Sequence, residues 1–330
     1  MNEAMEGLGG TEITRIAFSS SLAEAVGKNV VRIPKVRSRV VAVRDLVYKQ
    51  VFYDYHSTSL KIDLLYPAFD GPTPVVEGSK PCIVYVAGGG FVEQFTETFI
   101  GLQVGLVQAG YVVASVRHRL VPESQFPEPL EDVKAAVRWL RAHAETYGID
   151  KQRIGIMGDS AGGYMAAMMG ATNGVSKFDV GDHLEESSDV ACVADLYGCN
   201  DLTVIGAGYD DATVASHRTM ASPEALFLNG ISYAFLDNVG LSVFDAPPER
   251  AAEASPFTYL SEKTPPFLLM HGTADTLNSP LESSLLHEKL KEAGAESTLY
   301  MVEGAEHDDV LFDQPAIVDL LVGFFDEHLK

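Results

Sequence analysis

The sequence predicts an α/β protein with a mostly parallel central sheet that is flanked by helices. Short continuous apolar runs at 82–87 (CIVYVA) and 111–116 (YVVASV) are typical of strands that are buried on both faces of a parallel sheet. An amphipathic stretch at 130–147 indicates a helix between such strands, because its apolar residues recur at a spacing of about 3.6. The 330 residues are 46% hydrophobic, which suffices for one large core rather than several.

Residues 48–66 predict an antiparallel hairpin at the start of this domain. The runs YKQVFYDY and LKIDLLYP are separated by Ser57, Thr58 and Ser59, which favour a turn. Residues 1–45 match no pattern that we can assign, and we predict that they form an N-terminal arm. Whether this arm mediates a homodimer is left open by the sequence.

The amphipathic helix at 130–147 is expected to end at Gly148, since glycine commonly terminates helices. A further helix is expected at 281–293. Apolar, strand-like runs alternate with these helices, at 153–157 (RIGIM), 190–197 (VACVADLY), 267–272 (FLLMHG) and 297–302 (STLYMV). Alternating strands and helices predict right-handed crossovers and hence a mostly parallel sheet.

Residues 201–255 break this alternation, because they mix Gly, Pro and aromatic residues without a clear strand. We predict that they form a cap or lid over the carboxyl ends of the strands, where open α/β sheets bind ligands. The core then comprises residues 46–200 and 256–330.

The charge balance argues against nucleic acid and membranes as partners. With 24 Lys and Arg against 46 Asp and Glu, the net charge of −22 repels phosphate backbones and anionic lipids. No apolar stretch reaches the roughly 20 residues of a membrane-spanning helix, and we see no signal peptide. The 3 cysteines lack paired spacing, which predicts neither a disulfide framework nor a structural zinc site. These observations favour a cytoplasmic location.

A nucleophile motif follows the run RIGIM. Gly158, Asp159, Ser160, Ala161 and Gly162 form a G-x-S-x-G sequence between a strand and the small, apolar stretch GYMAAMMG, which can continue as a helix. In that context the serine occupies a tight turn at a helix N-terminus, where peptide dipoles favour negative charge on a substrate oxygen. The arrangement predicts Ser160 as a nucleophile and Asp159 as a brace for the turn.

A glycine-rich loop follows the run CIVYVA. Gly88, Gly89 and Gly90 lie at the carboxyl end of a predicted strand, where backbone amides are available to a ligand. The amides of Gly89, Gly90 and Ala161 are candidates for an oxyanion hole, which needs fixed donors. A simple loop-closing turn is the alternative. A phosphate cradle is disfavoured, because no G-K-[ST] or G-x-G-x-x-G sequence follows.

Asp275 and His307 are the remaining partners that a serine nucleophile needs. Both follow predicted strands at the same sheet edge as Ser160, and they keep the order Ser, Asp, His that is typical of such turns. Among the other histidines, His118 breaks that order, and His271 is expected to shape the Asp275 loop. No H-E-x-x-H motif or close His/Asp set is present, so we predict no metal and no cofactor.

These motifs resemble those of the α/β-hydrolase esterases related to hormone-sensitive lipase, especially the bacterial acetyl and feruloyl esterase branch. The resemblance rests on AGGGF, FPEPLEDVKAAVRWLRAHAETYGID, GDSAG and SPFTYLSEKTPPFLLMHGTADTLNSP, and it covers roughly residues 45 to 330. One departure is Ala87, where the family usually has a structural histidine. The resemblance implies an α/β-hydrolase fold with a catalytic triad and backbone oxyanion donors: Ser160, Asp275 and His307, with Gly89, Gly90 and Ala161.

Together the residues predict a serine-dependent carboxylic ester hydrolase that acts through an acyl-enzyme. The expected substrates are small-molecule esters with short, acetyl-type acyl groups or hydroxycinnamoyl groups, esters of carbohydrates among them. Candidate substrate contacts come from the glycine loop and the predicted cap: Phe91, Phe227, Leu228, Tyr233 and Phe235. Two alternatives remain open, a formamidase-like amide hydrolase and a non-catalytic ligand-binding protein of the same fold.

Overall fold

The computed structural model describes residues 36–68, 79–202, 205–206, 208–230 and 247–330 of the chain. Residues Arg39–Lys330 form one compact unit, and every described helix and strand lies in it. The sheet, its helices and the candidate site therefore belong to one compact body.

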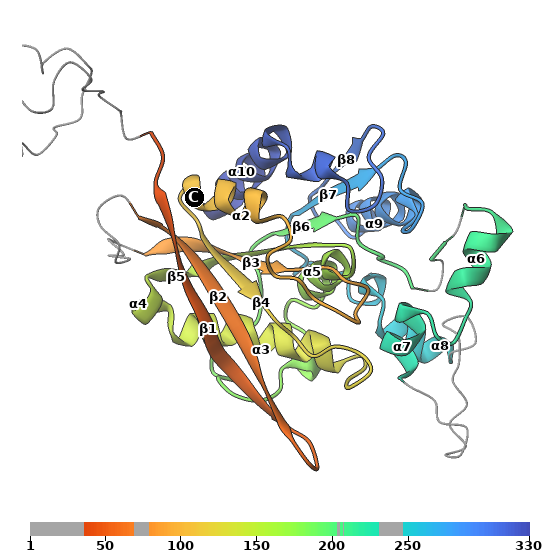
Figure 1. Ribbon diagram of the computed structural model, residues 1–330, viewed down its shortest axis with the longest axis horizontal. Helices are drawn as coiled ribbons and strands as arrows, with labels where there is room; N and C mark the ends of the chain where they lie inside the picture. Colours follow the sequence, from red (N-terminus) through yellow and green to blue (C-terminus); the bar gives the residue numbers. More distant parts are fainter. Residues whose placement is uncertain (1–35, 69–78, 203–204, 207, 231–246) are drawn as a thin grey trace, which may run out of the picture. The chain divides into compact units, whose positions relative to one another are not determined.

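Among the described residues, eight strands form a single sheet: β1 (Arg39–Phe52), β2 (Ser57–Ala68), β3 (Lys80–Val86), β4 (Val112–Val116), β5 (Ile149–Asp159), β6 (Val193–Leu196), β7 (Phe267–Gly272) and β8 (Ser297–Val302). Their order across the sheet is β1-β2-β4-β3-β5-β6-β7-β8 (Figure 1). β1 and β2 run antiparallel to their neighbours, whereas β3 to β8 are parallel to one another. The prediction of a mostly parallel sheet is confirmed.

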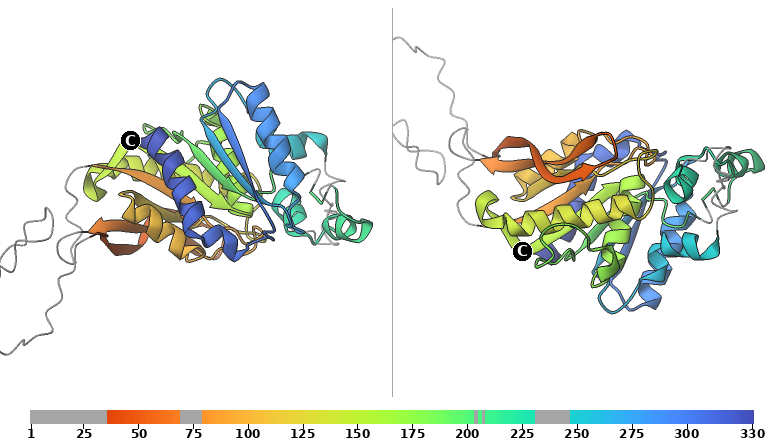
Figure 2. Two further views of the ribbon diagram at one scale, coloured as in Figure 1. Left: turned by 90° about the horizontal axis from the view of Figure 1, so that it is seen from above. Right: turned by 90° about the horizontal axis from the view of Figure 1, so that it is seen from below.

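The helices of the described residues are α2 (Ile100–Gln108), α3 (Glu128–Ala142), α4 (Ala144–Tyr147), α5 (Ala161–Ala171), α6 (Asp211–His217), α7 (Pro223–Asn229), α8 (Pro248–Glu253), α9 (Pro280–Glu292) and α10 (Pro315–Leu329). α2 and α10 cover one face of the sheet, where Leu106 and Phe325 join one buried apolar cluster (Figure 2). α3, α5 and α9 cover the other face, where Leu140 and Leu286 join a second cluster. None of the described helices combines the length and the apolarity that a bilayer-spanning segment requires.

Side chains of β3 alternate between these two clusters. Ile83 and Tyr85 enter the cluster beneath α2 and α10, whereas Val84 and Val86 enter the cluster beneath α3, α5 and α9. All four side chains are fully buried, because a central parallel strand is covered on both faces. This burial fixes the carboxyl end of the strand, and hence the start of the glycine loop that follows it.

The N-terminal hairpin is longer than the sequence predicts. β1 begins at Arg39, which pairs with Ala68, so residues 39–45 belong to the sheet rather than to the predicted arm. The turn lies at Tyr53–His56 instead of Ser57–Ser59, since the Tyr53 amide donates to the His56 carbonyl at 2.8 Å and their rings stack. These aromatic contacts close the turn earlier than the serine-rich stretch suggests. Residues 1–35 of the arm lie outside the described residues.

The predicted helix at 130–147 is observed as α3 followed by the single turn α4, and it ends at Gly148 in the left-handed conformation (φ 59°). Its polar side is not solvated throughout. Lys134 is fully buried and donates to the Thr172 carbonyl at 3.2 Å. Arg138 is also buried and pairs with Asp179 at 2.7 Å. The segment that follows α5 therefore covers part of the face that the charge pattern assigns to solvent.

The described part of the predicted cap contains α6, α7 and α8, which lie beyond the carboxyl ends of the parallel strands (Figure 1). α6 and α7 each begin with a side-chain cap, since Asp210 and Ser222 accept a hydrogen bond from an amide of their own helix. A Cβ on Gly90 would lie 3.5 Å from Pro223 at the start of α7. The cap thus reaches the glycine loop. Cap residues 203–204, 207 and 231–246 lie outside the described residues.

Candidate active site

The structure brings Ser160, Asp275 and His307 together at one edge of the sheet. Ser160 follows β5, Asp275 follows β7 and His307 follows β8, so all three lie at carboxyl ends of parallel strands. His307 Nε2 is 2.9 Å from Ser160 Oγ, and His307 Nδ1 is 2.8 Å from Asp275 Oδ2. Ser160 and His307 are partly exposed, whereas Asp275 is buried. A substrate therefore meets the hydroxyl and the imidazole but not the carboxylate.

Ser160 occupies a strained turn. Its φ of 51° and ψ of −122° lie in a region that side chains other than glycine rarely adopt. The glycines on either side permit the turn, because a Cβ on Gly158 would overlap the Gly162 carbonyl and a Cβ on Gly162 would overlap the Val86 carbonyl. The close approach of these backbones holds the hydroxyl at the start of α5.

Asp275 accepts hydrogen bonds at both carboxylate oxygens. Oδ1 accepts from the amides of Leu277 at 2.8 Å and Asn278 at 3.0 Å. Oδ2 contacts His307 at 2.8 Å and His271 Nε2 at 3.3 Å. Burial favours the neutral acid, but the hydrogen bonds from the two histidines outweigh it and hold the pKa of Asp275 below its usual range. The carboxylate is thus ionised and oriented toward His307.

His271 lies in the Asp275 loop, as the sequence predicts, and is fully buried. Its Nδ1 is 2.7 Å from Ser283 Oγ, and its Nε2 is 3.0 Å from the Asn278 carbonyl. Carbonyl and carboxylate oxygens both require a donor, so Nε2 carries a proton. His271 therefore supports the loop and has no contact with Ser160 among the described residues.

His307 packs against Tyr197, a contact that the sequence analysis misses. The two rings meet edge to face, with centroids 4.9 Å apart and planes at 72°. Tyr197 is fully buried and has a φ of 44°, which indicates that the surrounding structure forces its backbone into this position. The only sequence signal is that an aromatic residue ends the strand-like run at 190–197. The contact restricts the orientation of the imidazole.

Three backbone amides have the properties of oxyanion donors. Within the described residues, the amides of Gly89, Gly90 and Ala161 donate to no other protein group. Gly89 and Gly90 have φ values of 127° and 58°, and a Cβ on Gly89 would overlap the Glu93 carbonyl. Ala161 is the first residue of α5, where helix amides lack partners. Ala87, at the position of the usual histidine, is buried in the cluster beneath α2 and α10.

The candidate substrate contacts are more deeply buried than the sequence suggests. Phe91 stacks on Phe227 with centroids 4.1 Å apart, and both rings meet Tyr164 edge to face. Phe227 and Leu228 are fully buried. They belong to the apolar core of the described residues, and their contact with a substrate stays a prediction. Tyr233 and Phe235 lie outside the described residues.

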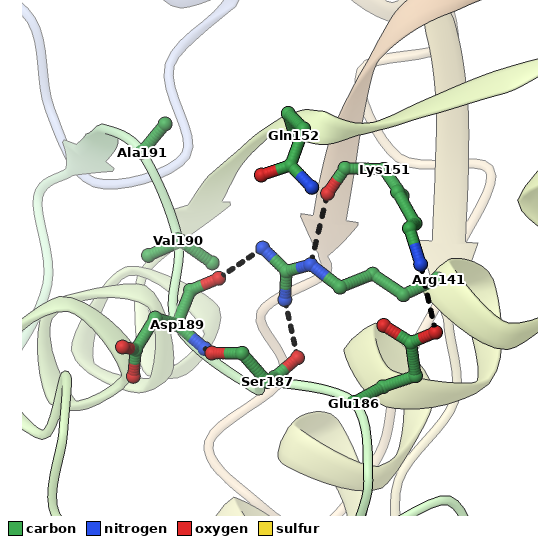
Figure 3. Close-up of a pocket in the computed structure, with 8 residues that line it drawn as sticks. All are labelled: Arg141, Lys151, Gln152, Glu186, Ser187, Asp189, Val190 and Ala191. Atoms are coloured by element: carbon green, nitrogen blue, oxygen red, sulfur yellow. Dashed lines mark hydrogen bonds and ion pairs between the residues drawn. The ribbon is translucent and has the colours of Figure 1, made fainter.

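A surface pocket lies at the other end of β5 from Ser160 (Figure 3). It contains Arg141, whose guanidinium donates to the backbone carbonyls of Lys151, Ser187 and Asp189. Lys151 pairs with Glu186 at 3.1 Å. These donors already have protein partners, and no triad residue lines the pocket. Arg141 joins the start of β5 to the segment 187–189.

The sheet order, the two helical layers and the serine turn define an α/β-hydrolase fold. The chain belongs to the BD-FAE family, whose model matches residues 72–290. Among solved structures, a truncated form of a carbohydrate esterase from gut microbiota has a TM-score of 0.72 at 24% identity, covering 90% of this chain and 98% of that one. The bifunctional GH43-CE protein of Bacteroides eggerthii has a TM-score of 0.68 at 26% identity, covering 88% of this chain and 38% of that one.

Curated relatives carry esterase names. Esterase LipC of Mycobacterium tuberculosis is 29% identical over 240 residues, which are 71% of this chain and 54% of LipC. A probable isoprenylcysteine alpha-carbonyl methylesterase of Arabidopsis thaliana is 25% identical over 240 residues, 72% of this chain and 47% of that protein. The chain spans about half the length of these curated relatives. The matches confirm the predicted resemblance to α/β-hydrolase esterases.

Proposed function

We propose that the protein hydrolyses carboxylic esters through an acyl-enzyme formed on Ser160. The observation that carries this proposal is the continuous pair of hydrogen bonds from Ser160 Oγ to His307 and from His307 to the buried Asp275. A serine hydroxyl is a weak nucleophile unless a base takes its proton, and an imidazole serves as that base when a carboxylate fixes its tautomer. The esterase names of the curated relatives support the same reaction class.

In the proposed reaction, Ser160 Oγ attacks the ester carbonyl carbon while its proton passes to His307 Nε2. The carbonyl oxygen becomes an oxyanion, which the amides of Gly89, Gly90 and Ala161 stabilise. Collapse breaks the bond to the alkoxy oxygen, and His307 returns the proton to the leaving alcohol. Water then attacks the acyl-enzyme by the same route and releases the carboxylic acid. Asp275 stays ionised and stabilises the imidazolium.

For the substrate we propose esters with short, acetyl-type acyl groups or hydroxycinnamoyl groups, esters of carbohydrates among them. The packing of Phe91 on Phe227 supports small acyl groups, because Phe91 directly follows Gly90 and both stacked rings are buried. The net charge of −22 disfavours anionic substrates. Formamides share the same chemistry and are tested beside the esters.

The test is hydrolysis of p-nitrophenyl esters from acetyl to decanoyl, with methyl ferulate, acetylated xylan and N-formylkynurenine in the same panel. We expect turnover to peak on a short acyl ester and to vanish in Ser160→Ala. Ser57→Ala is the matched control, because Ser57 is an exposed serine at the start of β2. Turnover of the formamide alone would replace the esterase proposal with an amide hydrolase, and full activity of Ser160→Ala would reject the nucleophile.

A further inference from the structure

One buried carboxylate links the two chain segments that supply the proposed oxyanion donors. Asp159 precedes Ser160 in the serine turn, and its Oδ2 accepts a hydrogen bond from the Gly88 amide at 3.1 Å. Gly88 directly precedes Gly89, whose amide is a proposed donor. Ala161, whose amide is another proposed donor, directly follows Ser160. The Asp159 side chain thus joins two segments that are 71 residues apart in the chain.

The other carboxylate oxygen is held from β3. The Tyr85 hydroxyl donates to Asp159 Oδ1 at 2.7 Å, and Tyr85 is fully buried while Asp159 is 4% exposed. The contact with the glycine loop leaves no spare room, since a Cβ on Gly88 would lie 2.6 Å from Asp159 Oδ2 and 3.0 Å from Ser160 Cβ. With one partner on each oxygen, the carboxylate cannot turn without losing a hydrogen bond.

We propose that Asp159 is a positioning residue, whose carboxylate fixes the Gly89 and Gly90 amides relative to Ser160 and the Ala161 amide. An oxyanion hole is effective because its donors are in place before the charge develops. A loop that drifts by a fraction of an ångström loses that advantage. The inference rests on the proposed ester hydrolysis, and it adds a side chain that acts on the reaction without touching the substrate.

The surroundings of Asp159 argue against a role in proton transfer. Both oxygens already accept hydrogen bonds, and no hydrogen bond joins Asp159 to His307 in the described residues. Tyr85, Tyr197, Asp308 and His307 are the ionisable groups near it. Burial raises the pKa of Asp159 to about 6, against the opposing effect of its two hydrogen bonds. At neutral pH the group is therefore an ionised acceptor for both donors.

Two substitutions separate the contacts of Asp159 from its charge. In Asp159→Asn, the amide oxygen can accept from Gly88 while the amide nitrogen donates to the Tyr85 hydroxyl, so both contacts persist without charge. Asp159→Ala loses both contacts. Tyr85→Phe separates the two contacts, because it removes the hydroxyl from one carboxylate oxygen and leaves the Gly88 contact in place.

With the best p-nitrophenyl ester of the panel, we expect kcat of Asp159→Ala to fall by about 10- to 100-fold at unchanged KM. The estimate lies below the loss of about 10²- to 10³-fold for complete removal of one oxyanion donor. Asp159→Asn and Tyr85→Phe should stay within about fivefold of the wild type. Rescue by Asn, with the loss confined to kcat, is a result that a general loss of stability does not produce.

A trifluoromethyl ketone gives a second readout. Ser160 Oγ bonds to its carbonyl carbon, the hydroxyl proton passes to His307, and the carbonyl oxygen becomes an oxyanion held by the same amides. The inhibition constant should therefore rise in Asp159→Ala in parallel with the loss of kcat, and it should change little in Asp159→Asn. If Asp159→Ala lacks a cooperative melting transition, Asp159→Ser replaces it, because its short side chain cannot reach both partners.

Three results would overturn the inference: kcat of Asp159→Ala within about threefold of the wild type, equal losses in the Ala and Asn variants, or a loss confined to KM. Equal losses would assign the effect to the charge rather than to the two contacts. Failure of the proposed function looks different, since the wild type itself would then hydrolyse no ester and would not bind the ketone.

Discussion

Two buried aspartates beside Ser160 have pKa values that are shifted in opposite directions. Asp275 and Asp159 are 3% and 4% exposed, but Asp159 is the more deeply enclosed of the two. Asp275 contacts four donors, two amides and two imidazoles, and its pKa lies below the usual range. Asp159 accepts from one amide and one hydroxyl, and burial raises its pKa to about 6. Depth of burial and the donors together decide whether the cost of a buried charge is overcome.

Asp195 in β6 supports this comparison. It is fully buried and accepts from the Gly198 amide at 2.8 Å and from Asn200 Nδ2 at 2.7 Å. Burial raises its pKa to about 6, as it does for Asp159. Two uncharged donors thus leave burial dominant in both cases. The region around Asp275 is built to keep a charge beside His307, whereas Asp159 and Asp195 hold backbone segments in place.

The largest expected effect comes from removing the charge of Asp275. In Asp275→Asn the amide can no longer enforce the tautomer in which His307 Nδ1 carries the proton, so we expect kcat to fall by about 10⁴-fold. Kinetics with the best ester of the panel measure this loss. Asp54→Asn, an exposed position in the hairpin turn, should retain wild-type kcat.

The same carboxylate should stabilise the fold. A folded-state pKa below the unfolded value contributes stability above that unfolded value, about 3.9, and the contribution is lost as the pH falls further. The difference in unfolding free energy between the wild type and Asp275→Asn should therefore shrink when urea titrations are moved from pH 7 to pH 3.5. A difference that grows toward low pH would contradict the account of Asp275.

Asp159→Asn should have the opposite pH dependence. The folded-state pKa of about 6 exceeds the unfolded value of about 3.9, so the native state binds the extra proton between these pH values. Wild-type stability then declines relative to the Asn variant as the pH rises through this window. Urea titrations at pH 4.5 and pH 7.5 should show the variant gaining about 2 kcal/mol at the higher pH.

Asp54→Asn, at an exposed position in the hairpin turn, is titrated beside Asp159→Asn as the control. A wild-type protein that gains stability relative to Asp159→Asn between pH 4.5 and pH 7.5 would reject the raised pKa. That outcome would place Asp159 with Asp275, as a carboxylate whose donors outweigh burial.

The sequence predicts the fold best where a local pattern decides the structure. FLLMHG coincides with β7, which is buried throughout, and STLYMV coincides with β8, the half-exposed strand at the edge of the sheet. α10 was not predicted, although Ile317, Leu321 and Phe325 recur every four residues on its buried side. The turn at Tyr53–His56 depends on a ring contact that no local pattern reveals.

At the active site, too, local patterns predict some residues, whereas long-range contacts have to be seen in the structure. Ser160, Asp275 and His307 were predicted because each follows a recognisable strand and the fold brings strand ends together. The link from Tyr85 to Asp159 joins residues that are 74 positions apart, and only the register of β3 beside β5 brings them into contact. Long-range contacts of this kind have no signature in one sequence.

The smallest expected effect tests whether the Asp275 loop depends on the cap. The Tyr209 hydroxyl donates to the Asp275 backbone carbonyl at 2.5 Å and connects the cap to this loop. Tyr209→Phe removes that bond but leaves all four donors of the carboxylate, so we expect kcat to change by less than about twofold and the unfolding free energy to fall by about 1 kcal/mol. Tenfold loss of kcat would mean that the cap, rather than the donors around the carboxylate, holds Asp275 beside His307.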